Sequence, residues 1–290
     1  MAGFFKFVDY NKVGKGVEKG QPQKNGLMLF LELYVRKFWL LVRLNIMYFV
    51  FSIPAILIAI FVTTSLLSLF YVDAFNGMPF MEYFKKDIDF ARLFTVMITF
   101  MSVFFGIVVV GPVFAGFTKI LRSFSREEPA FIWSDFKDCA FANLKQSIAI
   151  SLINLFSGLF IVFDIYISLY MNVTNKTAGT SLVFTVITFM ILIIGLIFLM
   201  MQIYIYPMMI TFKMSIKDIY KNALLFAFMR FIPNLLILII CFVIFALTFI
   251  YYLVGLILLP LITLSTVGFI LTFYADRQLR KHIDKNQTQG

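Results

Sequence analysis

The sequence predicts an all-α, polytopic membrane protein with six transmembrane helices arranged as three hairpins and amphipathic helices on the cytoplasmic face. The first observation behind this prediction is composition. Of 290 residues, 61% are hydrophobic and 14% are charged, about half the charged fraction of typical soluble domains. One soluble core could not bury so much apolar surface, whereas lipid-facing side chains need no cover from protein. The other two observations are the lengths of the apolar segments and the uneven distribution of Lys and Arg.

Six apolar segments are long enough to cross a bilayer. A spanning helix needs about 20 predominantly apolar residues, because the hydrocarbon layer is about 30 Å thick and a helix rises about 1.5 Å per residue. The predicted spans cover residues 44–70, 93–117, 147–171, 180–205, 233–253 and 256–275.

The last two spans come from one apolar run over residues 231–275. A single helix of that length would be about twice as long as the bilayer is thick, so the chain must turn back within the run. Tyr251, Tyr252 and Gly255 mark the turn, since Tyr favours the membrane interface and Gly permits a sharp reversal. Pro260 then predicts a kink early in the sixth span.

The basic residues predict the orientation. Of the 25 Lys and Arg residues, 21 fall before the first span, in the second and fourth loops and in the C-terminal tail, against 4 in the other loops. The positive-inside rule therefore places both termini in the cytoplasm of a cell-membrane protein. The net charge of +10 also attracts anionic lipid headgroups. It does not indicate nucleic-acid binding, because no folded basic domain could present a groove-reading element.

This topology divides the chain into three parts. Residues 1–26 form a basic cytoplasmic segment, residues 27–276 the membrane domain and residues 277–290 a cytoplasmic tail. Within the membrane domain, three segments of mixed apolar and charged residues precede the odd-numbered spans and predict amphipathic helices in the cytoplasmic interface. These segments cover residues 32–45, 133–148 and 215–234, and each contains an asparagine, namely Asn45, Asn143 and Asn222.

Two serines are the predicted N-caps of the second and third amphipathic helices. Ser134 and Ser215 each stand near the start of the periodic segment, where a side-chain oxygen can accept a hydrogen bond from an unpaired backbone N–H.

Asp164 is the acidic residue placed deepest in a predicted span, which makes it a functional candidate because an ionised carboxylate is costly in hydrocarbon. Three interpretations remain open. The carboxyl group is neutral or paired near the outer interface, with Thr185 and Thr188 as donors; it belongs to a proton or cation relay; or it lines a polar cavity. Asn154 and Gln202 lie in the inner third of their spans, where hydrogen bonds between helices explain them. A substrate pathway through both residues is the alternative.

A Gly-Pro pair marks the predicted inner end of the second span. Gly111 and Pro112 indicate a helix end or kink, and Gly116 allows close approach of another helix. The alternative is a hinge or a partner-docking elbow, followed by Arg122 and Arg126, which would face an acidic partner or lipid phosphates. Glu127 and Glu128 are then candidate partners for these arginines, which lie in the same loop.

Residues 111–148 resemble the YesL family of bacterial multi-pass membrane proteins. The matching positions are Gly111, Pro112, Ala115, Gly116, Lys119 and Arg122, followed by Asp135, Phe136, Lys137, Asn143, Lys145, Gln146 and Ser147. The resemblance extends over roughly residues 20–282, although the basic N-terminus and the outer first loop are longer than in a typical member. It implies six membrane helices. It also implies a helper role in sugar uptake, because family members are often encoded beside carbohydrate importers of the ABC class.

No enzyme motif or cofactor site is apparent. The sequence has no P-loop, zinc-ligand pair, nucleophile elbow or Rossmann glycine pattern. Cys139 falls in a cytoplasmic loop and Cys241 in a span, so neither a disulfide nor a metal site is expected. We therefore expect a non-enzymatic accessory or scaffold protein without a cofactor, with ABC importer subunits as its partners. The alternative is a small-solute transporter or channel with a polar path through Asp164, Asn154 and Gln202.

Overall fold

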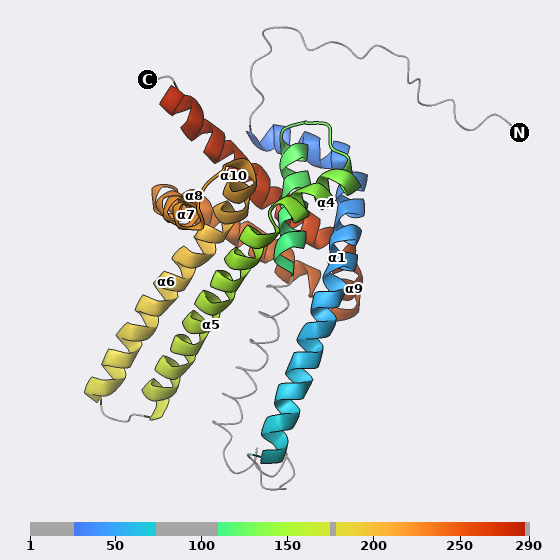
Figure 1. The fold of residues 1–290 in the computed structure, drawn as a ribbon. Coiled ribbons are helices and arrows are strands. Elements are labelled where there is room, and N and C mark those ends of the chain that lie inside the picture. The colour runs from blue at the N-terminus through green and yellow to red at the C-terminus, as the bar shows by residue number, and fades with distance from the viewer. Residues whose placement is uncertain (1–25, 74–109, 175–177, 288–290) are drawn as a thin grey trace, which may run out of the picture. The chain divides into compact units, whose positions relative to one another are not determined.

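The computed structural model describes residues 26–73, 110–174 and 178–287, and all regular structure in these ranges is helical (Figure 1). The elements in chain order are α1 (Gly26–Asp73), an unlabelled helix over residues 110–125, α4 (Ile132–Ala142), α5 (Leu144–Thr174), α6 (Ala178–Thr211), α7 (Ile216–Met229), α8 (Phe231–Thr248), α9 (Tyr252–Leu258), the π-helix η1 (Leu259–Thr263) and α10 (Leu264–Gln287).

Five stretches of these helices are long and apolar enough to cross a membrane. They cover Gly26–Ile58, Leu144–Leu169, Leu182–Thr211, Phe231–Thr248 and Leu253–His282. This finding supports the predicted class of multi-pass membrane protein. Of the predicted second span, residues 93–109 lie outside the described residues, and residues 110–117 are helical. The count of six therefore stays a prediction.

The chain divides into two compact units, residues 1–36 and residues 37–290. In the first unit, the described residues form the start of α1, where the rings of Phe30 and Tyr34 stack with centroids 6.0 Å apart. The segment over 32–45, predicted as a separate amphipathic helix, is part of the continuous helix α1. All elements discussed below belong to the second unit.

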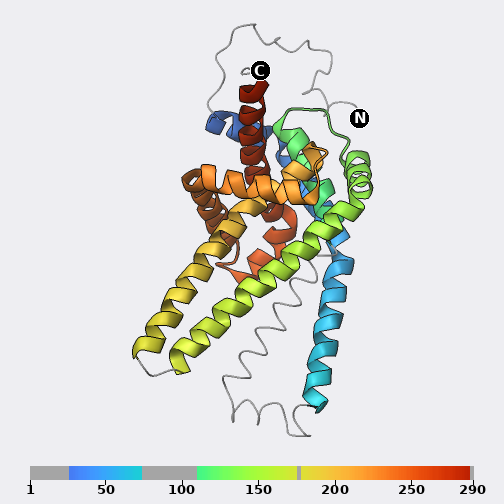
Figure 2. The same cartoon turned by 60° about the vertical axis from the view of Figure 1, so that its left-hand side comes forward.

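Helices α5 and α6 pack side by side in an antiparallel pair, as both cartoon views show (Figures 1 and 2). Asn154 lies opposite Gln202, and Ser168 lies opposite Thr188, with side-chain atoms 3.1 and 2.5 Å apart. The same number of residues separates the two positions on each helix, which fixes the antiparallel register. The helices contain the predicted spans 147–171 and 180–205.

The apolar run over 231–275 turns back on itself where the sequence predicts a turn. Helix α8 ends at Thr248, and α9 begins at Tyr252 after a bend over residues 249–251. The Thr248 and Thr263 hydroxyls lie 3.1 Å apart, and Tyr274 donates to Asn234 at 2.8 Å, so the returning helices run antiparallel to α8. A Cβ on Gly255 would lie 2.6 Å from the Thr248 carbonyl oxygen, so this close approach requires glycine.

The predicted disturbance at Pro260 takes the form of a π-helix. Proline has no N–H to donate, and a single π turn accommodates the missing hydrogen bond. The five residues of η1 contain Pro260 and connect α9 to α10, and Asn45 of α1 donates to the carbonyl of Leu259 at 2.9 Å. Helix α10 continues to Gln287, well beyond the predicted end of the sixth span at residue 275.

Short helices α4 and α7 precede α5 and α8, as the amphipathic segments predict. The Ser215 hydroxyl accepts a hydrogen bond from the Asp218 N–H at 3.2 Å, which confirms Ser215 as the N-cap of α7. The prediction for Ser134 was wrong, because α4 begins one residue after Phe131 and Ser134 lies within its first turn. Instead, the Asp135 carboxylate accepts the Phe131 N–H at 2.9 Å, which supplies the missing acceptor at this helix start.

The core of the second unit surrounds the C-terminal end of α6. Residues 203–209 are all buried there, which requires neighbours on every side of the helix. Helices α7 and α10 supply these neighbours, with Ile219, Ala223, Ala275 and Leu279 in the same buried cluster. Toward its start, by contrast, α6 exposes large side chains such as Phe189. A surface of this kind is favourable only against lipid or another protein.

Candidate functional site

Asn154 and Gln202, the two polar residues predicted in the inner parts of the spans, bond to each other. Gln202 Nε2 donates to Asn154 Oδ1 at 3.1 Å, and the Tyr220 hydroxyl of α7 donates to the same oxygen at 2.7 Å. The predicted bond between helices is confirmed, and Tyr220 extends it to a third helix. Burial raises the pKa of Tyr220, so this hydroxyl remains a hydrogen-bond donor at neutral pH.

Asp164 does not join this group. Its side chain is half-buried on α5. The Thr188 hydroxyl donates to the Phe184 carbonyl at 2.8 Å and pairs with Ser168, so the predicted donation from Thr188 to Asp164 was wrong. A threonine hydroxyl has one proton to give, and here that proton is already used.

A cavity of about 1290 Å³ lies within the second unit and has Asn154 and Gln202 in its wall. The rest of its described lining is mainly apolar, with Tyr48, Ser52 and Tyr206 among the few other polar contributors. Asp164 is not among these lining residues. The structure thus brings together two of the three residues of the predicted polar path and leaves out the third.

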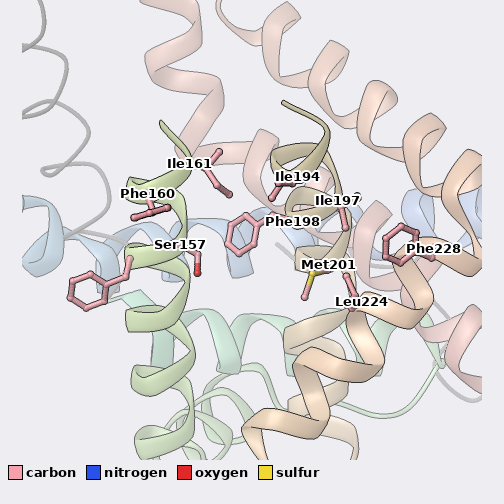
Figure 3. A pocket seen from close by; sticks show the side chains of 10 residues that line it. Ser157, Phe160, Ile161, Ile194, Ile197, Phe198, Met201, Leu224 and Phe228 are labelled. Carbon is pink, nitrogen blue, oxygen red and sulfur yellow. The ribbon is translucent and has the colours of Figure 1, made fainter. Parts of the chain in front are cut away.

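A second cavity of about 670 Å³ lies among α5, α6 and α7 (Figure 3). Its wall is almost entirely apolar, and Ser157 is the polar side chain that Figure 3 shows there. Phe156 and Phe160 are largely exposed. An apolar recess of this kind suits lipid chains, and its lining residues include no acid or base that could activate the Ser157 hydroxyl.

The helix over residues 110–125 packs closely against two neighbours through its glycines. A Cβ on Gly111 would clash with the Ser151 hydroxyl and lie 2.9 Å from the Ser147 carbonyl of α5. A Cβ on Gly116 would lie 2.6 Å from the Phe136 carbonyl of α4. The close approach predicted at Gly116 is confirmed. Pro112, however, does not end the helix, which continues to Ser125.

The residues at the start and end of α4 that carry the resemblance to the YesL family make structural contacts. Phe136 is 4% exposed and stacks on Phe51, with ring centroids 5.8 Å apart. Asp135 caps the start of the helix, and Asn143 donates to the Cys139 carbonyl at 2.9 Å where the helix ends. Burial raises the pKa of the Cys139 thiol, which therefore stays protonated near neutral pH.

The basic residues of this region converge on an acid that sequence reasoning did not single out. Asp276 of α10 is 3% exposed. Its Oδ1 accepts a hydrogen bond from Arg126 Nε at 2.8 Å and lies 3.7 Å from Arg122 Nε, while its Oδ2 lies 3.0 Å from Arg280 Nε. We call Asp276 and these three arginines the arginine cluster. The predicted pairing of Arg126 with Glu128 is also present, at 3.8 Å.

Burial is the main reason that the pKa of Arg122 is lowered, and the positive charge of Arg126 acts in the same direction. Asp276 opposes this shift, and the guanidinium remains charged at neutral pH. Lys119, which the motif also includes, is half-exposed on the same helix.

One signal could have identified Asp276 from the sequence. It is an acid at the end of an apolar segment, followed by arginines one and four residues later, and an i,i+4 pair lies on one face of a helix. Its other partners are about 150 residues away in sequence, and no local pattern predicts such a contact.

The fold and these contacts define a helical protein with stretches long and apolar enough to cross a membrane. In the described ranges, no three or more His, Cys, Asp or Glu residues are grouped to hold a metal ion. No family model matches the chain, and no similar curated protein or solved structure was found. The resemblance to the YesL family therefore stays a prediction.

Proposed function

We propose that this chain is a non-enzymatic accessory or scaffold protein of a membrane complex, with six spans in three hairpins and both termini in the cytoplasm. The observation that supports it best is how the polar groups between the helices are used. Gln202 and Tyr220 both donate to Asn154, and Tyr204 and Tyr274 both donate to Asn234. Groups paired in this way hold helices together and leave few free for a solute.

The outer face of α4 is the part of the protein that we propose to test for a partner. Phe136 anchors one side of this helix, whereas Trp133 and Phe141 are 60% and 66% exposed. Exposed aromatic residues are frequent in protein interfaces and also at the headgroup level of membranes. The proposed partner is an ABC-type carbohydrate importer, and this choice rests on the resemblance to the YesL family.

Photo-crosslinking distinguishes a partner from lipid. A photoreactive phenylalanine is placed at Trp133 or Phe141, with Phe189 of α6 as the matched control, since Phe189 is similarly exposed. We expect importer subunits in crosslinked products from native membranes at the two α4 positions, and lipid adducts alone at Phe189. Lipid adducts alone at all three positions would contradict the accessory role.

A small-solute transporter or channel is the second candidate, and the cavity of about 1290 Å³ beside Asn154 and Gln202 favours it. Uptake into proteoliposomes tests it through Asn154→Leu, which removes one polar group from the cavity wall, with Asp164→Asn as the companion. Transport requires that Asn154→Leu reduces uptake of a small polar solute. Unchanged uptake in both variants would eliminate a path through these residues.

A further inference from the structure

The arginine cluster contains more hydrogen-bond donors than its acidic partners can satisfy. Each guanidinium carries five N–H donors, and three guanidinium groups share the single buried carboxylate of Asp276. Glu128 is a second acid beside the arginine cluster, 3.8 Å from Arg126. The single charge of Asp276 cannot balance the three arginines around it, and Lys37 lies over the ring of Phe124, which stands between Arg122 and Arg126 in the sequence.

Arg122 shows this shortage of hydrogen-bond acceptors most clearly. Its side chain is 12% exposed, yet its Nε is buried without a hydrogen-bond acceptor in the part of the chain that the structure describes. The closest approach to Asp276 is 3.7 Å, which is too long for a hydrogen bond. A buried donor without an acceptor costs free energy, and such a group calls for an anion or water that supplies the acceptor.

The position of the cluster indicates which anion is available. Asp276 and Arg280 lie near the end of the apolar stretch Leu253–His282, where α10 changes from apolar to strongly basic. A helix that changes character in this way places its charged end at the level of the lipid headgroups. Phosphate groups are concentrated there, and the planar fork of arginine matches phosphate oxygens in paired hydrogen bonds.

We propose that Arg122, Arg126 and Arg280 bind the phosphate group of an anionic lipid headgroup, and that Asp276 holds the three side chains in position. The buried carboxylate bonds to Arg126 and lies beside Arg122 and Arg280, which fixes these side chains, while the Arg122 Nε donor has no acceptor in the described part of the chain. The inference is independent of the proposed accessory role.

Lipid retention by the purified full chain tests the proposal. Detergent micelles containing equal amounts of phosphatidylglycerol and phosphatidylcholine are used, and native mass spectrometry counts the bound lipids. An ionic strength of about 0.5 M screens the diffuse attraction of exposed charges but not a partly buried site. We expect phosphatidylglycerol to be retained roughly tenfold over phosphatidylcholine, the preference that about one charge-assisted hydrogen bond would give. Equal retention of the two lipids would overturn the proposal.

Three variants separate a built site from diffuse charge. Arg122→Gln should lower the preference roughly tenfold, and Arg122→Lys should lower it as well, since lysine keeps the charge but lacks the fork. Lys281→Gln is the matched control, because Lys281 is exposed on the same helix as Arg280, and it should leave the preference unchanged at this salt concentration. Equal effects of Arg122→Gln and Lys281→Gln would contradict a specific site.

A further arm distinguishes the lipid from free phosphate. Added inorganic phosphate should not displace phosphatidylglycerol from the wild-type chain, because the acyl chains contribute to lipid binding and are absent from the free ion. Displacement would mean that the free anion is the ligand and would overturn the lipid assignment. If Arg122→Gln fails to fold, Arg280→Gln replaces it, since Arg280 is 47% exposed and less important for packing.

Discussion

Glu127 adopts a positive φ of 58°, a conformation that non-glycine residues seldom adopt. It follows the last turn of the helix over 110–125. The Glu128 N–H donates to the Ser123 carbonyl at 2.9 Å, and the Glu127 N–H donates to the Phe124 carbonyl at 3.2 Å. This pair of bonds is the Schellman motif, in which glycine usually occupies the position of Glu127.

Replacing Glu127 by glycine or by alanine should therefore give proteins of different stability. Relative to Glu127→Ala, we expect Glu127→Gly to be about 1 kcal/mol more stable, because the left-handed conformation strains alanine but not glycine. Comparing the two variants cancels the contribution of the glutamate side chain, which both remove. Thermal unfolding in detergent measures the difference. Equal stability of the two variants would show that the motif is not maintained in solution.

The thiol of Cys139 should react slowly and with a shifted pH dependence. Burial raises its pKa, and hydrogen bonding from Asn143 only partly offsets this effect. The reactive thiolate therefore appears only as the pH rises through the raised pKa, above the value of about 8.5 for a free cysteine. Alkylation of wild-type Cys139 should still accelerate at pH values where an exposed cysteine has reached its plateau.

A cysteine on the exposed side of the same helix provides the control for this measurement. Lys137→Cys, combined with Cys139→Ser, places a thiol on the exposed side of α4. Replacing Cys241 by alanine in both proteins leaves one thiol to follow. If the two rate profiles had the same midpoint, the packing of Cys139 against the rest of the chain would be disproved.

At the scale of the element, Asn234 connects four helices. Its Oδ1 accepts hydrogen bonds from Tyr204 of α6 at 2.6 Å and Tyr274 of α10 at 2.8 Å, and its Nδ2 donates to the Phe226 carbonyl of α7 at 3.2 Å. The side chain is fully buried at the start of α8. Each bond in such a network contributes little, but all of them depend on this one amide.

Asn234→Leu should therefore destabilise the protein by about 2 kcal/mol. Leucine fills a similar volume but leaves two tyrosine hydroxyls buried without an acceptor. Asn222→Ala is the control, because Asn222 donates to the Asp218 carbonyl of its own helix, and it should cost about 0.5 kcal/mol or less. Unfolding in mixed micelles measures both changes. A loss for Asn234→Leu no greater than for Asn222→Ala would contradict the bridging role.

Features that depend on neighbouring residues could be predicted from the sequence, whereas contacts between distant residues could not. Apolar length predicts the positions of α5, α6 and α8, and paired tyrosines with Gly255 predict the turn before α9. These features depend on residues adjacent in sequence. The arginine cluster and the Asn234 network also contain bonds between residues 30 and 150 positions apart, and single-sequence periodicity contains no information on such pairs. The prediction of Ser134 as the N-cap of α4 was wrong for a local reason, because the Asp135 carboxylate accepts the hydrogen bond at this helix start instead.

At the scale of the whole molecule, the asparagines of the three predicted amphipathic segments do not all make the same contact. Asn45 donates to the Leu259 carbonyl far away in sequence, whereas Asn143 and Asn222 donate to carbonyls of their own helices four residues earlier. The asparagines therefore give no support to a repeated unit. The prediction of three hairpins depends instead on the spans and the distribution of basic residues.

Two termini on the same side of the membrane require an even number of spans. The five apolar stretches in the described ranges would alone place the ends on opposite sides, so we expect the segment over 93–117 to supply a sixth crossing. Single cysteines are introduced by Lys12→Cys, Asn175→Cys or Gln287→Cys after both native cysteines are replaced by serine. In sealed cells, we expect a membrane-impermeant maleimide to label only the Asn175→Cys protein, because the positive-inside rule places the two termini in the cytoplasm. Permeabilised cells should give labelling at all three positions, which controls for access. Labelling of one terminus but not the other in sealed cells would instead establish an odd number of spans.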